Sequence, residues 1–231
     1  MRSTALTTQL TQLTKFGFVN AYLVHEDDGL TLVDTAMNAA GELLDEARRL
    51  REPIRRIALT HGHGDHVGSL DALCERLGRE RVSVLMPAID QRILAGEEAD
   101  LPGRRRGSWP ELTTTPDVLL EPGDMVGSLE VIASPGHTPG HLAFLDRRDG
   151  SLIAGDAFTT VGRVEVPSHP TLRFPLAALA ALATWDRGQA VRSAVALRAL
   201  GPALLAVGHG RAIPSPGAGM DAAIRRAQPR S

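Results

Sequence analysis

The sequence predicts an α/β fold in one domain. Short apolar runs with strand character alternate with segments whose apolar residues recur at helical spacing, a pattern typical of sheets covered by helices. Of the 231 residues, 43% are hydrophobic, which is enough to bury a sizeable core. Because no internal repeat and no linker interrupts this pattern, we assign residues 1–231 to a single domain.

The individual elements follow from apolar runs and from the residues that bound them. In the first half of the chain we expect strands over 18–25, 30–34, 54–60 and 82–86, with a hairpin turn at Asp27-Asp28-Gly29. Helices are expected over 41–50, which Pro53 ends, over 67–77 and over 88–95. In the second half we expect strands over 118–120, 129–133, 142–145, 152–154 and 204–207, and helices over 176–200, with a break near Gly188, and over 219–227.

Residues 96–117 are predicted to form a lid or an inserted loop. Segments this long without strand or helix periodicity usually cover or line a site in compact domains, or else are disordered. The segment contains three consecutive arginines, Arg104, Arg105 and Arg106. They could meet an anionic substrate, but a run of this kind more often forms a solvated face, and we favour that interpretation.

Four potential metal ligands lie within six residues, where the strand over 54–60 gives way to the helix over 67–77: His61, His63, Asp65 and His66. A strand-to-helix turn can present side chains to a cleft while the two elements hold the backbone still. Imidazole and carboxylate groups suit Zn²⁺ and similar ions. A His-rich surface loop is the alternative, but three of the eight histidines of the chain fall here.

Three more groups of the same kind follow at the tips of later strands. They are His137 in the Pro- and Gly-rich loop over 134–141, Asp156 after the strand over 152–154, and His209 after the strand over 204–207. The full set suits two metals with three ligands each and one shared carboxylate, and such a pair can hold a bridging hydroxide at neutral pH. Since the set offers no thiolate, it favours two Zn²⁺, with Mn²⁺ or Fe²⁺ as alternatives.

In these residues the chain resembles the metallo-β-lactamase fold superfamily over nearly its whole length. The matching features occur in the expected order, namely Asp34 after the second strand, the His61-x-His63-x-Asp65-His66 motif, the His137 loop, Gly155-Asp156 and Gly208-His209-Gly210. The resemblance implies a four-layer αβ/βα sandwich with the site at one edge. It also implies one metal held by His61, His63 and His137, a second held by Asp65, His66 and His209, and a bridge at Asp156.

Within that superfamily, the bridging Asp156 is similar to the glyoxalase II, lactonase and phosphodiesterase branches, whereas true β-lactamases generally lack it. The loop over 134–141 looks most like small lactonase and thioesterase-like members. Two features depart from the named branches. Lactonases of this family carry a Tyr shortly after the bridging Asp, but the only Tyr here is Tyr22, and only about twenty residues follow His209, too few for the glutathione-binding domain of glyoxalase II.

We therefore predict a dinuclear metal-dependent hydrolase that attacks an ester, lactone or thioester carbonyl of a small molecule with a metal-bridging hydroxide. Asp65 is the candidate catalytic residue, orienting the hydroxide and carrying a proton. A metal-dependent phosphodiesterase or ribonuclease is the second hypothesis, although a net charge of −2 and 3% aromatic residues argue against nucleic acid. A non-haem iron protein similar to sulfur dioxygenases, or a metal-binding module without catalysis, is the third.

Five other residues have less specific expected roles. Asp34 either caps the turn after the second strand or orients a metal-bound His. His141 either orients a ligand or makes a structural hydrogen bond, and His169 is a candidate substrate contact. Cys74 falls within a predicted helix and is expected to be buried. Lys15 is the only lysine, so it is the one position for an amine nucleophile.

The sequence also predicts where the protein acts. Residues 1–15 lack the apolar segment of a signal peptide, and no apolar run is long enough to span a membrane. We expect a cytoplasmic protein that binds a small-molecule substrate and has no membrane or nucleic-acid partner. No sequence feature indicates an oligomeric state.

Overall fold

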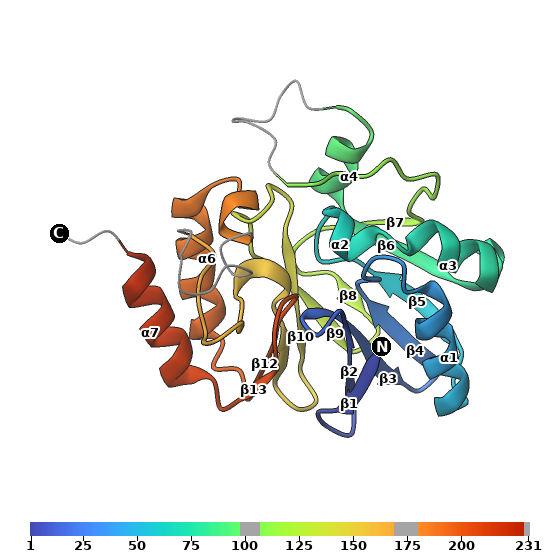
Figure 1. Cartoon of the computed structure of the whole chain (residues 1–231), viewed down its shortest axis with the longest axis horizontal. Helices are drawn as coiled ribbons and strands as arrows, with labels where there is room; N and C mark the ends of the chain where they lie inside the picture. Colours follow the sequence, from blue (N-terminus) through green and yellow to red (C-terminus); the bar gives the residue numbers. More distant parts are fainter. Residues whose placement is uncertain (98–106, 169–179, 229–231) are drawn as a thin grey trace.

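Two mixed β-sheets face each other, and helices cover the outer face of each (Figure 1). The computed structural model describes residues 1–97, 107–168 and 180–228. In Figure 1 the first half of the chain, blue to green, forms one sheet with its helices, and the yellow-to-red second half forms the other. The predicted four-layer αβ/βα sandwich is confirmed.

The first sheet has seven strands in chain order, antiparallel from β1 to β4 and parallel from β4 to β7. Its strands are β1 (Arg2–Ala5), β2 (Leu10–Lys15), β3 (Val19–Glu26), β4 (Gly29–Val33), β5 (Ile54–Ala58), β6 (Ser83–Pro87) and β7 (Val118–Leu120). The predicted hairpin at Asp27-Asp28-Gly29 joins β3 to β4.

The apolar pattern of the sequence does not predict β1 and β2, because many of their residues are Thr, Gln and other polar types. Thr11, Gln12 and Thr14 of β2 are nevertheless buried, and the last two are held by side-chain hydrogen bonds. Gln12 Nε2 donates to Asn20 Oδ1 (2.8 Å) and to Gly210 O (3.1 Å). These strands therefore extend the sheet through polar contacts that leave no apolar alternation in the sequence.

The second sheet has the strand order β13-β12-β11-β10-β9-β8, and only its β11–β12 pair is parallel. Its strands are β8 (Met125–Val126), β9 (Leu129–Ala133), β10 (Leu142–Asp146), β11 (Ser151–Ile153), β12 (Leu204–Ala206) and β13 (Ile213–Pro214). The strands predicted over 118–120 and 129–133 both form, but they belong to different sheets, since β7 pairs with β6 and β9 with β8 and β10.

Amphipathic helices supply the two outer layers, because each buries one apolar face on a sheet. The first sheet is covered by α1 (Ala40–Leu50), α2 (Gly64–Val67), α3 (Leu70–Leu77) with the short η1 (Arg79–Arg81), and α4 (Ala88–Leu94). The second is covered by α6 (Arg187–Ala199) and α7 (Gly217–Ala227), with η2 (Gly155–Ala157) after β11.

The helix predicted over 176–200 is interrupted slightly earlier than expected. Residues 180–183 are helical, and α6 begins at Arg187, so Gly188 lies inside the helix. The break falls at 184–186, where the Asp186 side chain caps α6 by accepting from Gln189 N (2.8 Å). Residues 176–179 lie outside the described part of the chain.

Strand ends from both sheets meet at one edge of the sandwich. Leu142 N, at the start of β10, donates to Thr60 O (2.9 Å), which follows β5 in the other sheet. Gly210 N donates to Phe18 O (3.0 Å) just before β3. The loops that carry the predicted ligands are therefore tied together across the two sheets. No helix in the described ranges is long and apolar enough to cross a membrane.

Candidate metal centre

The turn between β5 and α2 places four predicted ligands at the edge where the sheets meet. His63 keeps an extended backbone (φ −72°, ψ 148°) and α2 begins at the next residue, so the chain changes direction within the motif. The side chains of His61, His63 and His66 are 0%, 3% and 0% exposed. The turn is therefore part of the protein interior and not a His-rich surface loop.

The first group of candidate ligands, here called the histidine triad, consists of His61, His63 and His137. One ligand atom from each residue lies within 4.8 Å of the others. The Nδ1 atom of His63 is 3.0 Å from the Nε2 atom of His137. Two imidazoles from loops 74 residues apart thus face each other at a spacing that a shared ion would also require.

The second group, here called the mixed triad, consists of Asp65, His66 and His209, again with ligand atoms within 4.8 Å of one another. His209 Nε2 is 3.1 Å from Asp65 Oδ2, and His66 Nε2 is 3.9 Å from the same oxygen. The Asp65 side chain is 32% exposed, in contrast to the buried histidines. It is the member of this triad that solvent reaches most easily.

Asp156 lies between the two triads. Its Oδ2 atom is 3.4 Å from His137 Nε2 and 3.2 Å from His209 Nε2, and its Oδ1 atom is 3.5 Å from His66 Nε2. A Cβ atom at Gly208 would come within 2.1 Å of Asp156 Oδ1, so only glycine at 208 allows this approach. The structure thus brings all seven predicted residues into one cluster, with this carboxylate at the centre.

The charges within the cluster differ between the triads. Burial lowers the pKa of His61 and of His137 well below the ordinary value, and neighbouring imidazoles lower the pKa of His61 further. These two side chains are neutral at pH 7, which is the form that binds a metal ion. No proton has to leave them for an ion to bind.

The mixed triad is charged in the metal-free protein. Burial opposes the charged form of His209, but the carboxylates of Asp156 and Asp65 outweigh it and raise its pKa to about 9. Burial likewise opposes the charged form of His66, whose pKa is raised by Asp34, Asp156 and Asp65. In turn, burial favours the neutral forms of Asp65 and Asp156, but the nearby imidazoles hold both carboxyl pKa values below the usual range.

The donor set fits divalent metal ions. Four buried side-chain atoms of the cluster make no hydrogen bond within the described chain, namely His61 Nε2, His66 Nε2, His209 Nδ1 and Asp156 Oδ1. Unsatisfied buried polar atoms cost free energy, so several at one point indicate a site for an ion. Imidazole nitrogens and carboxylate oxygens are ligands for zinc, manganese and iron alike.

The family model described as the metallo-beta-lactamase superfamily matches residues 14–209, a span that contains both triads and Asp156. The chain belongs to the metallo-beta-lactamase superfamily. The predicted resemblance is confirmed, and with it the assignment to a family of metal-dependent hydrolases that bind divalent ions.

Three curated relatives in this superfamily cover different shares of the chain. The "Uncharacterized protein YobT" of Bacillus subtilis (strain 168) is 40% identical over 216 residues, 91% of each chain. The "Probable metallo-hydrolase YflN" of the same strain is 31% identical over 216 residues, 83% of this chain and 80% of that one. A hydroxyacylglutathione hydrolase of Aeromonas salmonicida (strain A449) is 30% identical over 145 residues, 61% of this chain and 47% of that one.

A solved structure extends the superfamily comparison to three dimensions. TTHA1623 in a di-iron-bound form is 27% identical and matches with a TM-score of 0.66 over 88% of this chain and 93% of that chain. The alignment covers nearly the whole of both chains, so the similarity is to the complete sandwich and not to one layer.

Two residues outside the seven candidate ligands contact the cluster directly. Asp34 Oδ2 is 2.7 Å from His66 Nδ1, and the same carboxylate accepts from Thr60 N (2.8 Å). Of the two expected roles of Asp34, the structure shows the orienting contact to a histidine. His141 Nε2 accepts from the backbone N of the candidate ligand Asp156 (3.0 Å), and its Nδ1 lies 2.8 Å from Ser134 Oγ in its own loop, so it makes both a contact to a candidate ligand and a structural hydrogen bond.

The remaining residues singled out in the sequence lie apart from the cluster or outside the described chain. Cys74 is buried in α3, as predicted. His169 and the three arginines at 104–106 lie outside the described residues. Residues 107–117 of the predicted lid segment are described, and within them Trp109 packs edge-on against His63 with ring centroids 5.1 Å apart.

A cavity of about 130 Å³ opens onto the cluster. Its described walls combine five of the predicted ligands with small or apolar residues: Phe18, His63, Asp65, Gly107, Ser108, His137, Asp156, Ala180, Ala183 and His209. Tyr22 does not line this cavity. Its buried hydroxyl donates to Val207 O instead (2.7 Å), and burial raises the pKa of this hydroxyl. The cavity therefore presents the candidate ligands beside an apolar wall.

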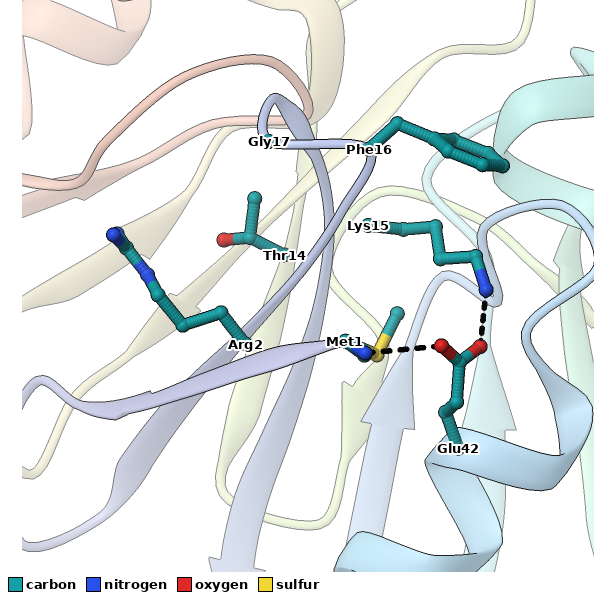
Figure 2. A pocket seen from close by; sticks show the side chains of 7 residues that line it. All are labelled: Met1, Arg2, Thr14, Lys15, Phe16, Gly17 and Glu42. Carbon is teal, nitrogen blue, oxygen red and sulfur yellow. Dashed lines mark hydrogen bonds and ion pairs between the residues drawn. The ribbon is translucent and has the colours of Figure 1, made fainter.

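A second depression, of about 560 Å³, lies over β1, the β2–β3 turn and α1, away from the triads (Figure 2). Its single carboxylate, Glu42, contacts both the Met1 ammonium (2.9 Å) and Lys15 Nζ (Figure 2). Lys15 is therefore engaged in an ion pair on this face and takes no part in the metal centre.

Proposed function

We propose that this superfamily member is a dinuclear metal-dependent hydrolase that acts on the ester, lactone or thioester carbonyl of a small molecule. The observation that carries the proposal is the position of Asp156, within 3.5 Å of one imidazole of the histidine triad and two of the mixed triad. A carboxylate placed between two complete triads fits a pair of ions that share one ligand. The hydroxyacylglutathione hydrolase relative supports a thioester, since an acylglutathione carries its acyl group on sulfur.

In this proposal the histidine triad would hold one ion, the mixed triad would hold a second, and Asp156 would serve both. When bound, such a pair supplies an activated water as nucleophile at neutral pH and polarises the carbonyl that it attacks. The protein fixes the positions of the ligands through the contacts of Asp34 and His141. It also keeps most of the cluster dry, because six of the seven residues are at least nine-tenths buried.

Asp65 is the candidate catalytic residue. Its carboxylate is the most exposed of the cluster and lines the cavity, so a water in the cavity can donate to it. Because the neighbouring imidazoles hold its pKa low, Asp65 stays ionised and acts as an acceptor. The ionised Asp65 carboxylate can orient the attacking water. A proton that the carboxylate takes from this water can then pass to the leaving group.

The cavity supports a small, neutral acyl group. Phe18, Ala180 and Ala183 supply apolar wall, and none of the lining residues in the described ranges is Lys or Arg. A phosphodiester, the alternative substrate, is an anion and is commonly bound by cationic side chains. The position of Tyr22 also separates this site from lactonases that carry a Tyr beside the bridging Asp.

The proposal assigns zinc first, because the donor set is made of imidazoles and carboxylates. Iron is the alternative that the structural comparison supports, since TTHA1623 is described in a di-iron-bound form. Metal content therefore has to be measured together with activity.

The test is elemental analysis of protein produced without added metal, combined with turnover of an ester, a lactone, a thioester and a phosphodiester on the same sample. Two zinc or manganese ions per chain with chelator-sensitive hydrolysis of a carbonyl substrate are expected. Hydrolysis of the phosphodiester alone would overturn the substrate class. One iron per chain with oxygen uptake on a thiol, and no hydrolysis, would overturn the reaction.

A further inference from the structure

A second buried carboxylate, Asp90 of α4, lies behind the histidine triad without being one of its ligands. The residue is 0% exposed. Its Oδ2 atom accepts from Gly62 N (2.8 Å) and Thr138 Oγ1 (2.7 Å), and its Oδ1 atom accepts from Gly140 N (2.8 Å). One side chain therefore uses both of its oxygens on two separate loops.

These two loops carry the histidine triad. Gly62 lies between His61 and His63 in the turn after β5, and Thr138 follows His137 in the loop before β10. The first loop belongs to one sheet and the second loop to the other. The only covalent connection between them runs through more than seventy residues, so their spacing has to be fixed by tertiary contacts.

An ionised carboxylate suits this position better than any neutral side chain. It offers acceptor sites on both oxygens and carries no proton that competes with the three donors around it. An asparagine of the same shape would place its NH₂ group against a backbone N–H of one loop, so that two donors would face each other. Burying a charge among neutral donors costs stability, and burial raises the pKa of Asp90 to about 6.

The chain also makes room for this carboxylate. A Cβ atom at Gly140 would come within 2.6 Å of Asp90 Oδ1 and 2.7 Å of Asp90 N. Contacts under about 3 Å require a shift, and here backbone and a fixed carboxylate stand in the way. Glycine at 140 therefore allows the loop of His137 to approach Asp90.

We propose that Asp90 is a positioning residue that clamps the loops of His61 and His137 together and sets the geometry of the histidine triad before an ion binds. This rests on the proposed function only in taking those histidines as ligands. The clamp itself is a property of the metal-free chain, and it can be tested without turnover.

The first experiment measures amide hydrogen exchange in the metal-free protein, comparing Asp90→Asn with a matched control. Asp146→Asn is that control, since Asp146 is also buried, at 3% exposure, and accepts from Arg148 Nε (3.0 Å) at the far end of β10. Asp90→Asn should raise exchange in peptides covering both 59–66 and 134–141, and Asp146→Asn in neither. Faster exchange in one loop alone, or equal exchange in both variants, would overturn the clamp.

The second experiment measures affinity for Zn²⁺ by competition with a chromophoric chelator, and records the electronic spectrum of the Co²⁺-loaded protein. Asp90→Asn should weaken binding of the ion at the histidine triad about 10–100-fold, as loss of a supporting hydrogen bond typically does, and should alter the Co²⁺ spectrum. Asp146→Asn should change neither. Gly140→Ala, which displaces Asp90 without removing its charge, should give the same loss as Asp90→Asn.

The outcomes separate this inference from the proposed function. Weaker ion binding in Asp90→Asn and Gly140→Ala supports the clamp, even in a protein that hydrolyses none of the test substrates. Unchanged affinity and an unchanged Co²⁺ spectrum in a folded Asp90→Asn protein would overturn the clamp, even when the wild type is an active hydrolase. If Asp90→Asn fails to fold, the same two measurements on Gly140→Ala test the clamp.

Discussion

The two triads of the candidate metal centre differ in the charge of their side chains in the metal-free chain. In the histidine triad, His61 and His137 are neutral in the metal-free chain because burial lowers the pKa of each imidazole, and Asp90 accepts hydrogen bonds from the loops that carry them. The mixed triad pairs raised imidazole pKa values with ionised carboxylates. A buried site without its ions can thus be kept stable either by removing charge or by balancing it.

The largest expected effect comes from removing the residue that both triads share. Asp156→Ala should lower kcat/KM on the carbonyl substrate by about 10³-fold or more, because metal activation is worth several kcal/mol of transition-state stabilisation. Steady-state kinetics, with circular dichroism as a check on folding, measures this. Turnover that persists in a folded variant containing no metal would contradict the role of Asp156.

The next effect distinguishes the two triads from each other. His61 belongs to the histidine triad and also lies with His66 and Asp156 in a further ligand group, whereas His209 falls only in the mixed triad. His61→Ala should therefore abolish binding of both ions at micromolar metal, and His209→Ala should retain about one ion per chain. Elemental analysis after gel filtration measures the difference. Equal metal content in the two variants would contradict this predicted difference between His61 and His209.

A smaller effect is expected from the support of the mixed triad. Asp34 adopts a left-handed backbone (φ 60°), which Asn tolerates, so Asp34→Asn changes the contact to His66 without added backbone strain. We expect a 10–100-fold loss of affinity for the ion at the mixed triad and a similar loss of kcat/KM. Asp28→Asn, which removes an exposed carboxylate paired with Arg56, is the control and should change neither. Full affinity in Asp34→Asn would assign Asp34 to folding alone.

The last prediction concerns how the free energy of unfolding depends on pH, and its expected effect on turnover is the smallest. Burial raises the pKa of Asp90 to about 6 from its ordinary 3.8, so the folded chain binds this proton more tightly than the unfolded chain. Its contribution to stability is fully present below about pH 4 and is lost as the pH rises through about 6. Because Asp90→Asn does not titrate, the wild type should lose roughly 2–3 kcal/mol relative to the variant between pH 4 and 7.

Denaturant titrations of the two metal-free proteins at each pH measure that difference, and effects common to both chains cancel in it. A difference that stays constant, or that grows in favour of the wild type with rising pH, would mean that Asp90 is ionised throughout this range.

Local sequence patterns predicted most of the elements and failed where stabilisation is polar. The apolar strands β3 to β6 and the amphipathic α1 and α3 carry their own periodicity. The polar β2 does not, because Gln12 and its neighbours are stabilised by hydrogen bonds to residues as distant as Gly210. The sequence also did not predict that β7 and β9 belong to different sheets, since both are apolar runs of the same kind.

The sequence by itself determined the ligand types, their order and the strand ends that carry them, because metal ligands and apolar periodicity are written in residue identities. It did not reveal Asp90, which has no motif around it and reads as one polar residue in a short helix. Only the tertiary structure decided that this carboxylate faces two loops, that Asp156 lies between the triads, and which imidazoles are charged. Those properties depend on burial and on distances between segments far apart in the chain, and no local pattern encodes either.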